Sequence, residues 1–187
     1  MFIQTEATPN PQVLKFLPGR ELLPGGSREF VDVGEAAASP LARALFQVDG
    51  VTRVYFGDEF LTVTKDPDSD WAYLKAPILA EIMDHFTSGA PLIEGAEAVA
   101  DEEVYEGETA QIVAEIKDLI DTRIRPAVAQ DGGDILFARF EPDTGVVFLN
   151  MRGACSGCPS SAATLRAGVE NMLKHYVPEV TRVEQTL

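Results

Sequence analysis

Both cysteines of this chain lie in one short stretch, Gly153-Ala154-Cys155-Ser156-Gly157-Cys158-Pro159. Two thiols separated by two residues can turn toward a common point, where they can share a metal or form a disulfide. The glycines of the stretch, Gly153 and Gly157, let the backbone bend sharply and come close to a bound group. Cys155 and Cys158 are therefore the candidate metal- and cofactor-binding residues, and the sequence offers no candidate catalytic residue.

The residues that follow the pair predict a helix that begins beside the thiols. Pro159 suits the first position of a helix, where its missing N–H would have no partner in any case. A helix N-terminus favours negative charge, which a thiolate or an anionic metal–thiolate cluster carries. Arg152 and Arg166 are further candidates to offset that charge, with an ordinary solvated or ion-paired side chain as the alternative for each.

Composition and charge limit the classes of protein to consider. The chain has 187 residues, 45% of them hydrophobic, which is enough for one ordinary domain or two small ones. Its formal net charge of -15 argues against binding to nucleic acid or to an anionic membrane surface. No apolar run approaches the roughly 20 residues that span a bilayer. We therefore expect a globular protein that has neither nucleic acid nor membrane among its partners.

The cysteine count bears on location in the cell. Two cysteines in one close pair do not form the disulfide framework of a small secreted protein. The first residues, Met1 to Glu6, lack the basic, apolar or Arg-rich features of a signal or transit peptide. We therefore expect a reducing compartment and a cytoplasmic location, and the sequence is also compatible with the processed mature form of an organellar protein.

Residues 1–87 predict a small mixed domain with no evident chemistry. Runs of apolar and β-branched residues predict strands, and Ser39 and the pair Ser69-Asp70 predict the N-caps of two helices. His85 lies in the second of these helices, and we expect it to be a packing or surface residue. The predicted strands cover residues 1–5, 13–17, 28–33, 51–56 and 60–64, and the last two form a hairpin.

Residues 88–108 differ from their surroundings in composition. They contain seven Asp or Glu residues, several glycines, and no Lys or Arg. Like charges repel one another and extend such a segment. We therefore predict an acidic linker between two domains, with a docking strip for a basic partner as the alternative.

Residues 109–187 predict the order helix, strand, strand, helix, strand. Pro126 ends or kinks the first helix, which residues 127–130 can continue. Asp131-Gly132-Gly133-Asp134 is then a strong turn signal. Apolar runs over 135–140 and 146–151 predict a hairpin, so the cysteine pair lies at a strand-to-helix junction. The fold class is α+β (mixed α/β) with two small domains. The apolar face of the first helix has four residues: Val113, Ile116, Ile120 and Ile124.

The motifs of the second domain resemble those of a known family. Ile124-Arg125-Pro126, Asp131-Gly132-Gly133-Asp134 and the cysteine stretch are similar to the NifU-like C-terminal domain of the NFU family of iron-sulfur scaffold and carrier proteins. This resemblance covers residues 110–187.

The first domain resembles the same family. Thr8-Pro9-Asn10-Pro11 and Lys15-Phe16-Leu17-Pro18-Gly19 are similar to the family's N-terminal domain. The resemblance implies that Cys155 and Cys158 bind an iron-sulfur cluster. It also implies that the cluster comes from an upstream donor and is passed to apo iron-sulfur proteins.

Counting ligands leads to the same kind of site. A 4Fe-4S or 2Fe-2S cluster usually takes four thiolates, and this chain offers two. Either two chains share one cluster as a homodimer, or outside ligands complete it. A cluster held between subunits by short loops is poorly enclosed, so its ligands can be exchanged for those of an acceptor. We therefore expect a scaffold or carrier and not an enzyme. Of the two cluster types, we expect 4Fe-4S in preference to 2Fe-2S.

Two other functions stay open. A thiol-disulfide oxidoreductase uses the same cysteine spacing, but its nucleophilic thiol normally opens a helix, whereas Pro159 places both thiols before the helix. A zinc-bridged structural dimer is also allowed, because a tetrahedral all-cysteine zinc site needs four thiolates. His175 lies far along the helix from the loop, and we expect it to be hydrogen-bonded or exposed and not a ligand.

Overall fold

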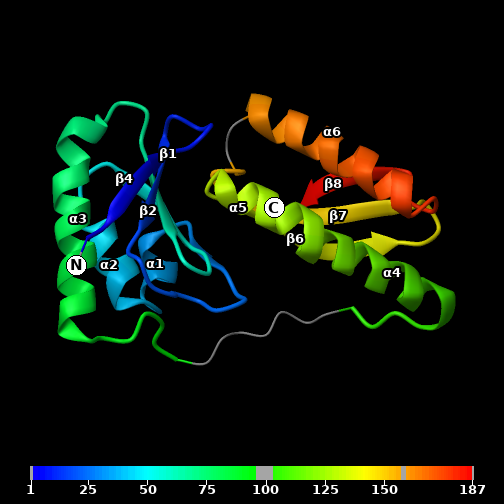
Figure 1. The fold of residues 1–187 in the computed structure, drawn as a ribbon, viewed down its shortest axis with the longest axis horizontal. Helices are drawn as coiled ribbons and strands as arrows, with labels where there is room; N and C mark the ends of the chain where they lie inside the picture. The colour runs from blue at the N-terminus through cyan, green and yellow to red at the C-terminus, as the bar shows by residue number, and fades with distance from the viewer. Residues whose placement is uncertain (1, 96–102, 157–158, 187) are drawn as a thin grey trace. The chain divides into compact units, whose positions relative to one another are not determined.

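The computed structural model describes residues 2–95, 103–156 and 159–186. The chain forms two compact units, one on each side of residues 96–102 (Figure 1). Each unit combines helices with one β-sheet, so the predicted α+β class with two small domains is confirmed. Gly157 and Cys158 lie outside the described residues.

Five antiparallel strands form the sheet of the N-terminal unit, in the order β1-β2-β5-β4-β3. The predicted hairpin is confirmed, because Val54 pairs with Val63 across β4 and β5. Phe16, Phe30 and Phe56 of this sheet are fully buried in one core. The strand bounds are Gln4–Ala7 (β1), Val13–Leu17 (β2), Arg28–Phe30 (β3), Val51–Phe56 (β4) and Leu61–Lys65 (β5).

The helices of the N-terminal unit begin where the sequence places their caps. The Ser39 hydroxyl accepts a hydrogen bond from the Ala42 N–H at 3.1 Å, and the Asp70 carboxylate accepts one from the Ala72 N–H at 2.9 Å. Both predicted caps are therefore confirmed. The helix bounds are Val33–Ala36 (α1), Pro40–Phe46 (α2) and Trp71–Ser88 (α3).

The strand predicted over residues 28–33 is too long. β3 ends at Phe30, and the chain turns into the short helix α1 at Val33. The Asp32 carboxylate accepts a hydrogen bond from the Glu35 N–H at 2.8 Å and so caps this helix. The local cap therefore outweighs the alternating pattern that predicted a longer strand.

The C-terminal unit has a three-stranded sheet in the order β6-β7-β8. β6 (Gly133–Glu141) and β7 (Val146–Gly153) form the predicted antiparallel hairpin, and β8 (Arg182–Thr186) pairs with β7 in parallel. A parallel pair needs a crossover connection, which α6 (Pro159–Tyr176) supplies. The predicted order of elements is confirmed, and so is the start of a helix at Pro159.

The first helical segment of this unit widens before its proline. α4 (Gly107–Leu119) passes into a π-helical turn (Ile120–Ile124) and then into α5 (Arg125–Gln130). The Arg125 N–H donates to the Ile120 carbonyl five residues earlier, just before Pro126, which has no N–H and would clash with the carbonyl one α-turn back. The sequence predicted that the helix ends or kinks at Pro126 and can continue over residues 127–130. The α-helix breaks over residues 120–124, just before the proline, and α5 then continues to Gln130, as predicted.

Helices and strands of the C-terminal unit enclose one apolar core. Alternate residues of β7 point into it, because successive side chains of a strand point to opposite faces. Ile116 of α4, Ile135 of β6, Leu149 of β7 and Leu173 of α6 are fully buried there, and Cys155 belongs to the same cluster. The core thus reaches the loop that the sequence singled out.

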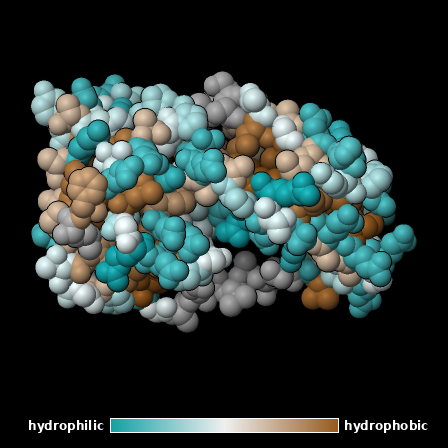
Figure 2. All heavy atoms as spheres, in the orientation of Figure 1, coloured by the Kyte–Doolittle hydropathy of each residue, from teal (hydrophilic) through white to brown (hydrophobic). Residues whose placement is uncertain are grey.

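The surface agrees with the acidic composition. Hydrophilic residues cover much of the face of both units in Figure 2. Among the described residues, none of the helices has both the length and the apolar character that crossing a membrane requires.

Candidate metal centre

Cys155 lies two residues beyond the end of β7, in the turn that leads toward α6. Gly133, the first residue of β6, pairs with Gly153, the last residue of β7. Ala154 extends this ladder, since its N–H donates to the Gly132 carbonyl at 3.0 Å. The hairpin therefore fixes the backbone of Cys155 beside the turn that precedes β6.

The turn after β7 is closed by its own hydrogen bonds. Gly153 has a φ of 63°, a conformation that favours glycine. The N–H and the hydroxyl of Ser156 both donate to the Gly153 carbonyl, at 3.1 and 2.8 Å. Cys155 thus sits in a tight turn whose backbone is held from both sides.

Gly133 leaves the space that the Cys155 side chain occupies. A Cβ atom at position 133 would overlap the Cys155 Sγ and would lie 3.0 Å from the Cys155 backbone nitrogen. Backbone atoms cannot move away from such a contact without shifting the hairpin. The close approach therefore requires glycine at 133, and Cys155 is only 6% exposed beneath it.

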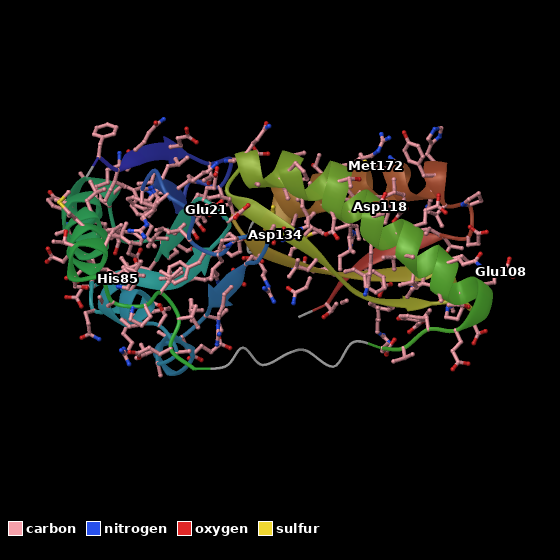
Figure 3. All side chains as sticks on the ribbon, turned by 60° about the horizontal axis from the view of Figure 1, so that its bottom comes forward. Glu21, His85, Glu108, Asp118, Asp134 and Met172 are labelled. Atoms are coloured by element: carbon pink, nitrogen blue, oxygen red, sulfur yellow. The ribbon has the colours of Figure 1, made fainter. Side chains whose placement is uncertain are left out.

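A buried ion pair anchors the strand that carries Gly133. The Arg125 Nε and Nη2 atoms donate to the two carboxylate oxygens of Asp134 at 2.8 and 3.0 Å. The Ile135 N–H also donates to Asp134, at 2.9 Å. Figure 3 shows Asp134 at the start of β6. This two-point contact ties the beginning of α5 to the residue next to Gly133.

The surroundings of Cys155 disfavour its thiolate. Burial, followed by the negative charges of Asp131 and Asp134, raises the pKa of the Cys155 thiol to about 12. The sequence predicted surroundings that favour negative charge because a helix begins nearby. For Cys155 the structure shows the opposite, since loss of solvent and two carboxylates act against the charged form.

This environment predicts how Cys155 reacts when it is the only thiol. In a Cys158→Ser variant, the rate at which iodoacetamide alkylates Cys155 should rise about tenfold per pH unit up to about pH 11, because the thiolate is the nucleophile. The rate is followed by mass spectrometry, with circular dichroism at each pH to verify the fold. A rate that levels off near the ordinary thiol pKa of 9.0 in a folded protein contradicts this prediction.

The other residues named from the sequence have less direct places. Of the two predicted ligands, the structure describes Cys155, and Cys158 lies outside the described residues. Arg152 lies on β7 in register with Asp134 of β6. His175 is exposed, as expected, and its ring packs edge-on against Tyr176 with the ring centroids 4.9 Å apart.

Arg166 has a carboxylate near it on its own helix. It is exposed on α6, and it lies one turn before Glu170. The pKa of Glu170 is lowered, first by a hydrogen bond from Lys174 and last by the charge of Arg166. Arg166 therefore acts on a carboxylate of its own helix.

Two residues whose charges act on Cys155, Asp131 and Asp134, were not identified as site residues from the sequence, and neither was Arg125, which pairs with Asp134. The turn signal around Gly132 and Gly133 located both aspartates along the chain. Their proximity to Cys155 depends on the register of β6 against β7, which the sequence does not specify.

Comparison with known families covers most of the chain. Residues 3–89 match the family model described as "Scaffold protein Nfu/NifU N terminal". Residues 116–184 match the one described as "NifU-like domain". The first match lies in the N-terminal unit, and the second includes Cys155, Asp131 and Asp134.

Curated relatives match along almost the whole chain. It is 51% identical to NifU-like proteins 4 and 5, mitochondrial, of Arabidopsis thaliana, with 99% of this chain and 66% and 68% of those proteins covered. It is also 51% identical to the NFU1 iron-sulfur cluster scaffold homolog, mitochondrial, of Drosophila willistoni, over 99% of this chain and 63% of that protein. The chain thus spans about two thirds of the length of these relatives.

These relatives correct the expected location. All three are named mitochondrial, so the sequence-based prediction of a cytoplasmic protein is wrong. The prediction failed because cysteine usage separates oxidising from reducing surroundings and does not distinguish one reducing compartment from another.

The resemblance drawn from the motifs is confirmed by these findings. Both halves of the chain match models of the same family, in the order that the motifs indicated, and half of all aligned residues are identical in relatives from a plant and an insect. The chain belongs to the NFU family of NifU-like scaffold proteins.

Proposed function

We propose that this chain binds a labile iron-sulfur cluster through Cys155 and Cys158, shares it with a second copy of itself, and passes it to apo iron-sulfur proteins. The observation that carries the proposal is the placement of Cys155, held at the end of a rigid hairpin in a chain that has one other cysteine. The Drosophila relative is named an iron-sulfur cluster scaffold homolog, and the proposal extends that role to this chain.

The shortage of ligands supports sharing between two chains. A cluster usually takes four thiolates, and each chain carries two. Among the described residues, no group of three or more His, Cys, Asp or Glu side chains is placed to hold a metal ion. We propose that a second chain, and not a small thiol, supplies the remaining ligands, so that a homodimer binds a 4Fe-4S cluster.

The same geometry supports a carrier and not a redox enzyme. A thiol-disulfide oxidoreductase needs an accessible thiol that is ionised before it attacks, and Cys155 is buried under Gly133 with its pKa raised to about 12. A metal displaces the thiol proton as it binds, so the raised pKa disfavours the oxidoreductase more than the cluster site. The proposed role is non-catalytic: the chain receives a cluster from an upstream donor and releases it to an acceptor.

Anaerobic reconstitution with ferrous iron and sulfide tests this proposal. The loaded protein should be brown, should contain four irons and four acid-labile sulfides per two chains, and should have twice the 20.3 kDa mass of one chain. Replacing Cys155 or Cys158 with serine should abolish both the colour and the doubling of mass.

Three outcomes would contradict the proposal. One is a cluster retained by a single chain without any small thiol. The second is a colourless protein with disulfide reductase turnover. The third is tight zinc binding together with failure to take up iron, which would instead identify a structural zinc site.

A further inference from the structure

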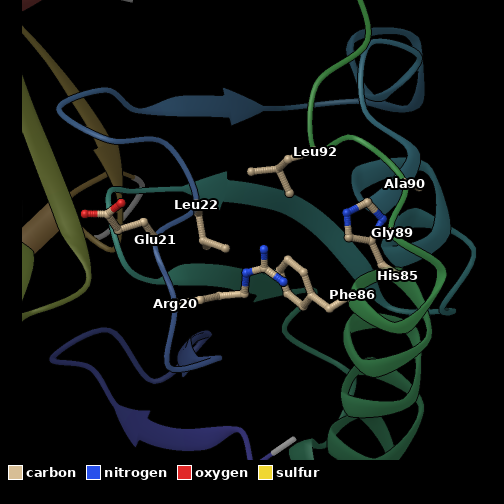
Figure 4. Close-up of a pocket in the computed structure, with 8 residues that line it drawn as sticks. All are labelled: Arg20, Glu21, Leu22, His85, Phe86, Gly89, Ala90 and Leu92. Carbon is tan, nitrogen blue, oxygen red and sulfur yellow. The ribbon is translucent and has the colours of Figure 1, made fainter.

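A pocket of about 150 Å³ lies in the N-terminal unit, between the segment that follows β2 and the end of α3 (Figure 4). Arg20 and Leu22 line it from that segment, and His85 and Phe86 line it from the last turn of α3. Gly89, with a φ of 70°, ends α3 and turns the chain back along the pocket. The pocket is thus built by a different unit from the one that holds Cys155.

His85 is a buried polar side chain in this pocket. It is 8% exposed, and its ring packs edge-on against Phe86 with centroids 5.2 Å apart. Within the described part of the chain, neither ring nitrogen has a hydrogen bond. Burial, and then the charge of Arg20, lowers the pKa of His85, so the ring is neutral near pH 7 and offers one N–H donor. The ring lines the pocket, and its nitrogens are not fully enclosed by protein, so the donor is available to a ligand.

Arg20 brings a positive charge to the same pocket. Its guanidinium lies over the Phe86 ring, 5.0 Å from the ring centroid, and it forms no ion pair with any described residue. Figure 4 shows the neighbouring Glu21 carboxylate directed away from Arg20 and His85. A guanidinium in contact with a ring keeps N–H donors that match the two oxygens of a carboxylate.

We propose that this pocket binds a carboxylate group carried on a short apolar body, with Arg20 and the His85 N–H as its donors and Leu22, Phe86 and Leu92 around the apolar part. The pocket volume suits a ligand of about seven heavy atoms, which can reach millimolar affinity. This proposal is independent of the cluster site.

The charges of the pocket favour a single negative charge on the ligand. The end of a helix carries a partial negative charge, which is smaller than the full positive charge of Arg20, so a cationic ligand would be repelled. One guanidinium and one neutral imidazole balance one charge. A doubly charged phosphate would exceed it, in a chain whose net charge is already -15.

The carboxylate can belong to a free small acid or to the C-terminus of another polypeptide. Titrations of the full chain with 4-methylpentanoate, and with a hexapeptide that ends in leucine, test the two sources. The readout is the ring Cε1–H signal of histidine in carbon–proton NMR spectra. The chain has two histidines, so exposed His175 serves as the internal reference. We expect the His85 signal to shift saturably with one or both probes while that of His175 stays in place.

Matched variants separate the proposed contact from nonspecific effects. Arg20→Gln should weaken binding at least about tenfold, because it removes a charge-assisted hydrogen bond. Arg28→Gln is the control: the Arg28 guanidinium also lies over a ring, 5.4 Å from the Phe30 centroid, but outside this pocket. It should bind like the unchanged chain, as should the Cys155→Ser, Cys158→Ser double variant, whose cluster site is removed.

The probe that binds identifies the source of the carboxylate. Binding of the free acid alone indicates a small-molecule ligand, and tighter binding of the peptide than of its C-terminal amide indicates a polypeptide terminus. The proposal is overturned if neither probe shifts the His85 signal at concentrations up to about 20 mM. It is also overturned if the peptide amide binds as tightly as the peptide with a free C-terminal carboxylate.

Discussion

Alanine in place of Gly133 should displace Cys155 and reduce cluster loading at least about tenfold, the effect expected when a residue that supports a metal ligand is lost. The added Cβ would overlap the Cys155 Sγ and crowd its backbone nitrogen, so the loop after β7 has to move. Overpacking of this kind also destabilises a fold by about 1–3 kcal/mol. Loading is measured as visible absorption and iron per chain after anaerobic reconstitution.

A second readout does not depend on the cluster. In a Cys158→Ser background, Gly133→Ala should speed alkylation of Cys155 near pH 7, because the thiol becomes exposed. Gly168→Ala is the matched control, since a Cβ there meets nothing within 4 Å; it should load normally and stabilise α6 by up to about 1 kcal/mol. If Gly133→Ala loads as well as Gly168→Ala, the close approach of Gly133 to Cys155 does not govern the site.

Arg125→Met should destabilise the C-terminal unit by about 3 kcal/mol, because the buried Asp134 carboxylate loses both hydrogen bonds from the Arg125 guanidinium. The Asp134 side chain is 5% exposed, whereas that of Arg125 is 25% exposed. Asp134→Asn should therefore have a smaller effect, since water can reach the remaining guanidinium and the amide oxygen can still accept from the Ile135 N–H. For a unit of this size, Arg125→Met corresponds to a fall in melting temperature of roughly 10–20 °C.

The two units can be followed separately in one experiment. Trp71 is the only tryptophan of the chain, and its indole N–H donates to the Pro11 carbonyl at 3.0 Å within the N-terminal unit. Its fluorescence transition should stay unchanged, while circular dichroism records the earlier unfolding of the C-terminal unit. The double variant Arg125→Met, Asp134→Asn should lose less stability than the sum of the two single changes. Additive losses would mean that the ion pair does not couple these positions.

Local signals predicted much of the fold. Ser39 and Asp70 marked two helix starts because a cap depends on a hydrogen bond within three residues. The apolar runs before and after Thr144 marked the β6–β7 hairpin, because a hairpin also joins segments that are close together along the chain. An error arose where one local preference opposed another: Asp32 caps a helix inside a predicted strand. The break in the helix at Pro126 was predicted, whereas its form, a π-helical turn over residues 120–124, was not.

The candidate site was predictable in its chemistry and not in its environment. The spacing of Cys155 and Cys158, with glycines around them, predicted a site that binds a metal or forms a disulfide, and the family resemblance favoured an iron-sulfur cluster. The acidity around Cys155 was not evident, because Asp131 lies in the turn before β6 and Asp134 lies on β6, both distant from Cys155 along the chain. A helix start nearby suggested that negative charge would be favoured, whereas burial and the two carboxylates decide the opposite for this thiol.

The sequence by itself determined which donors the chain has, how few they are, and which family it belongs to, since residue types and short spacings are properties of the chain alone. Only the tertiary structure decided that Cys155 is buried under Gly133 and that Arg125 holds Asp134 beside it. The same holds for the pocket of Arg20 and His85. These contacts join residues distant along the chain, and strand register and helix packing bring such residues together only when the whole unit has folded.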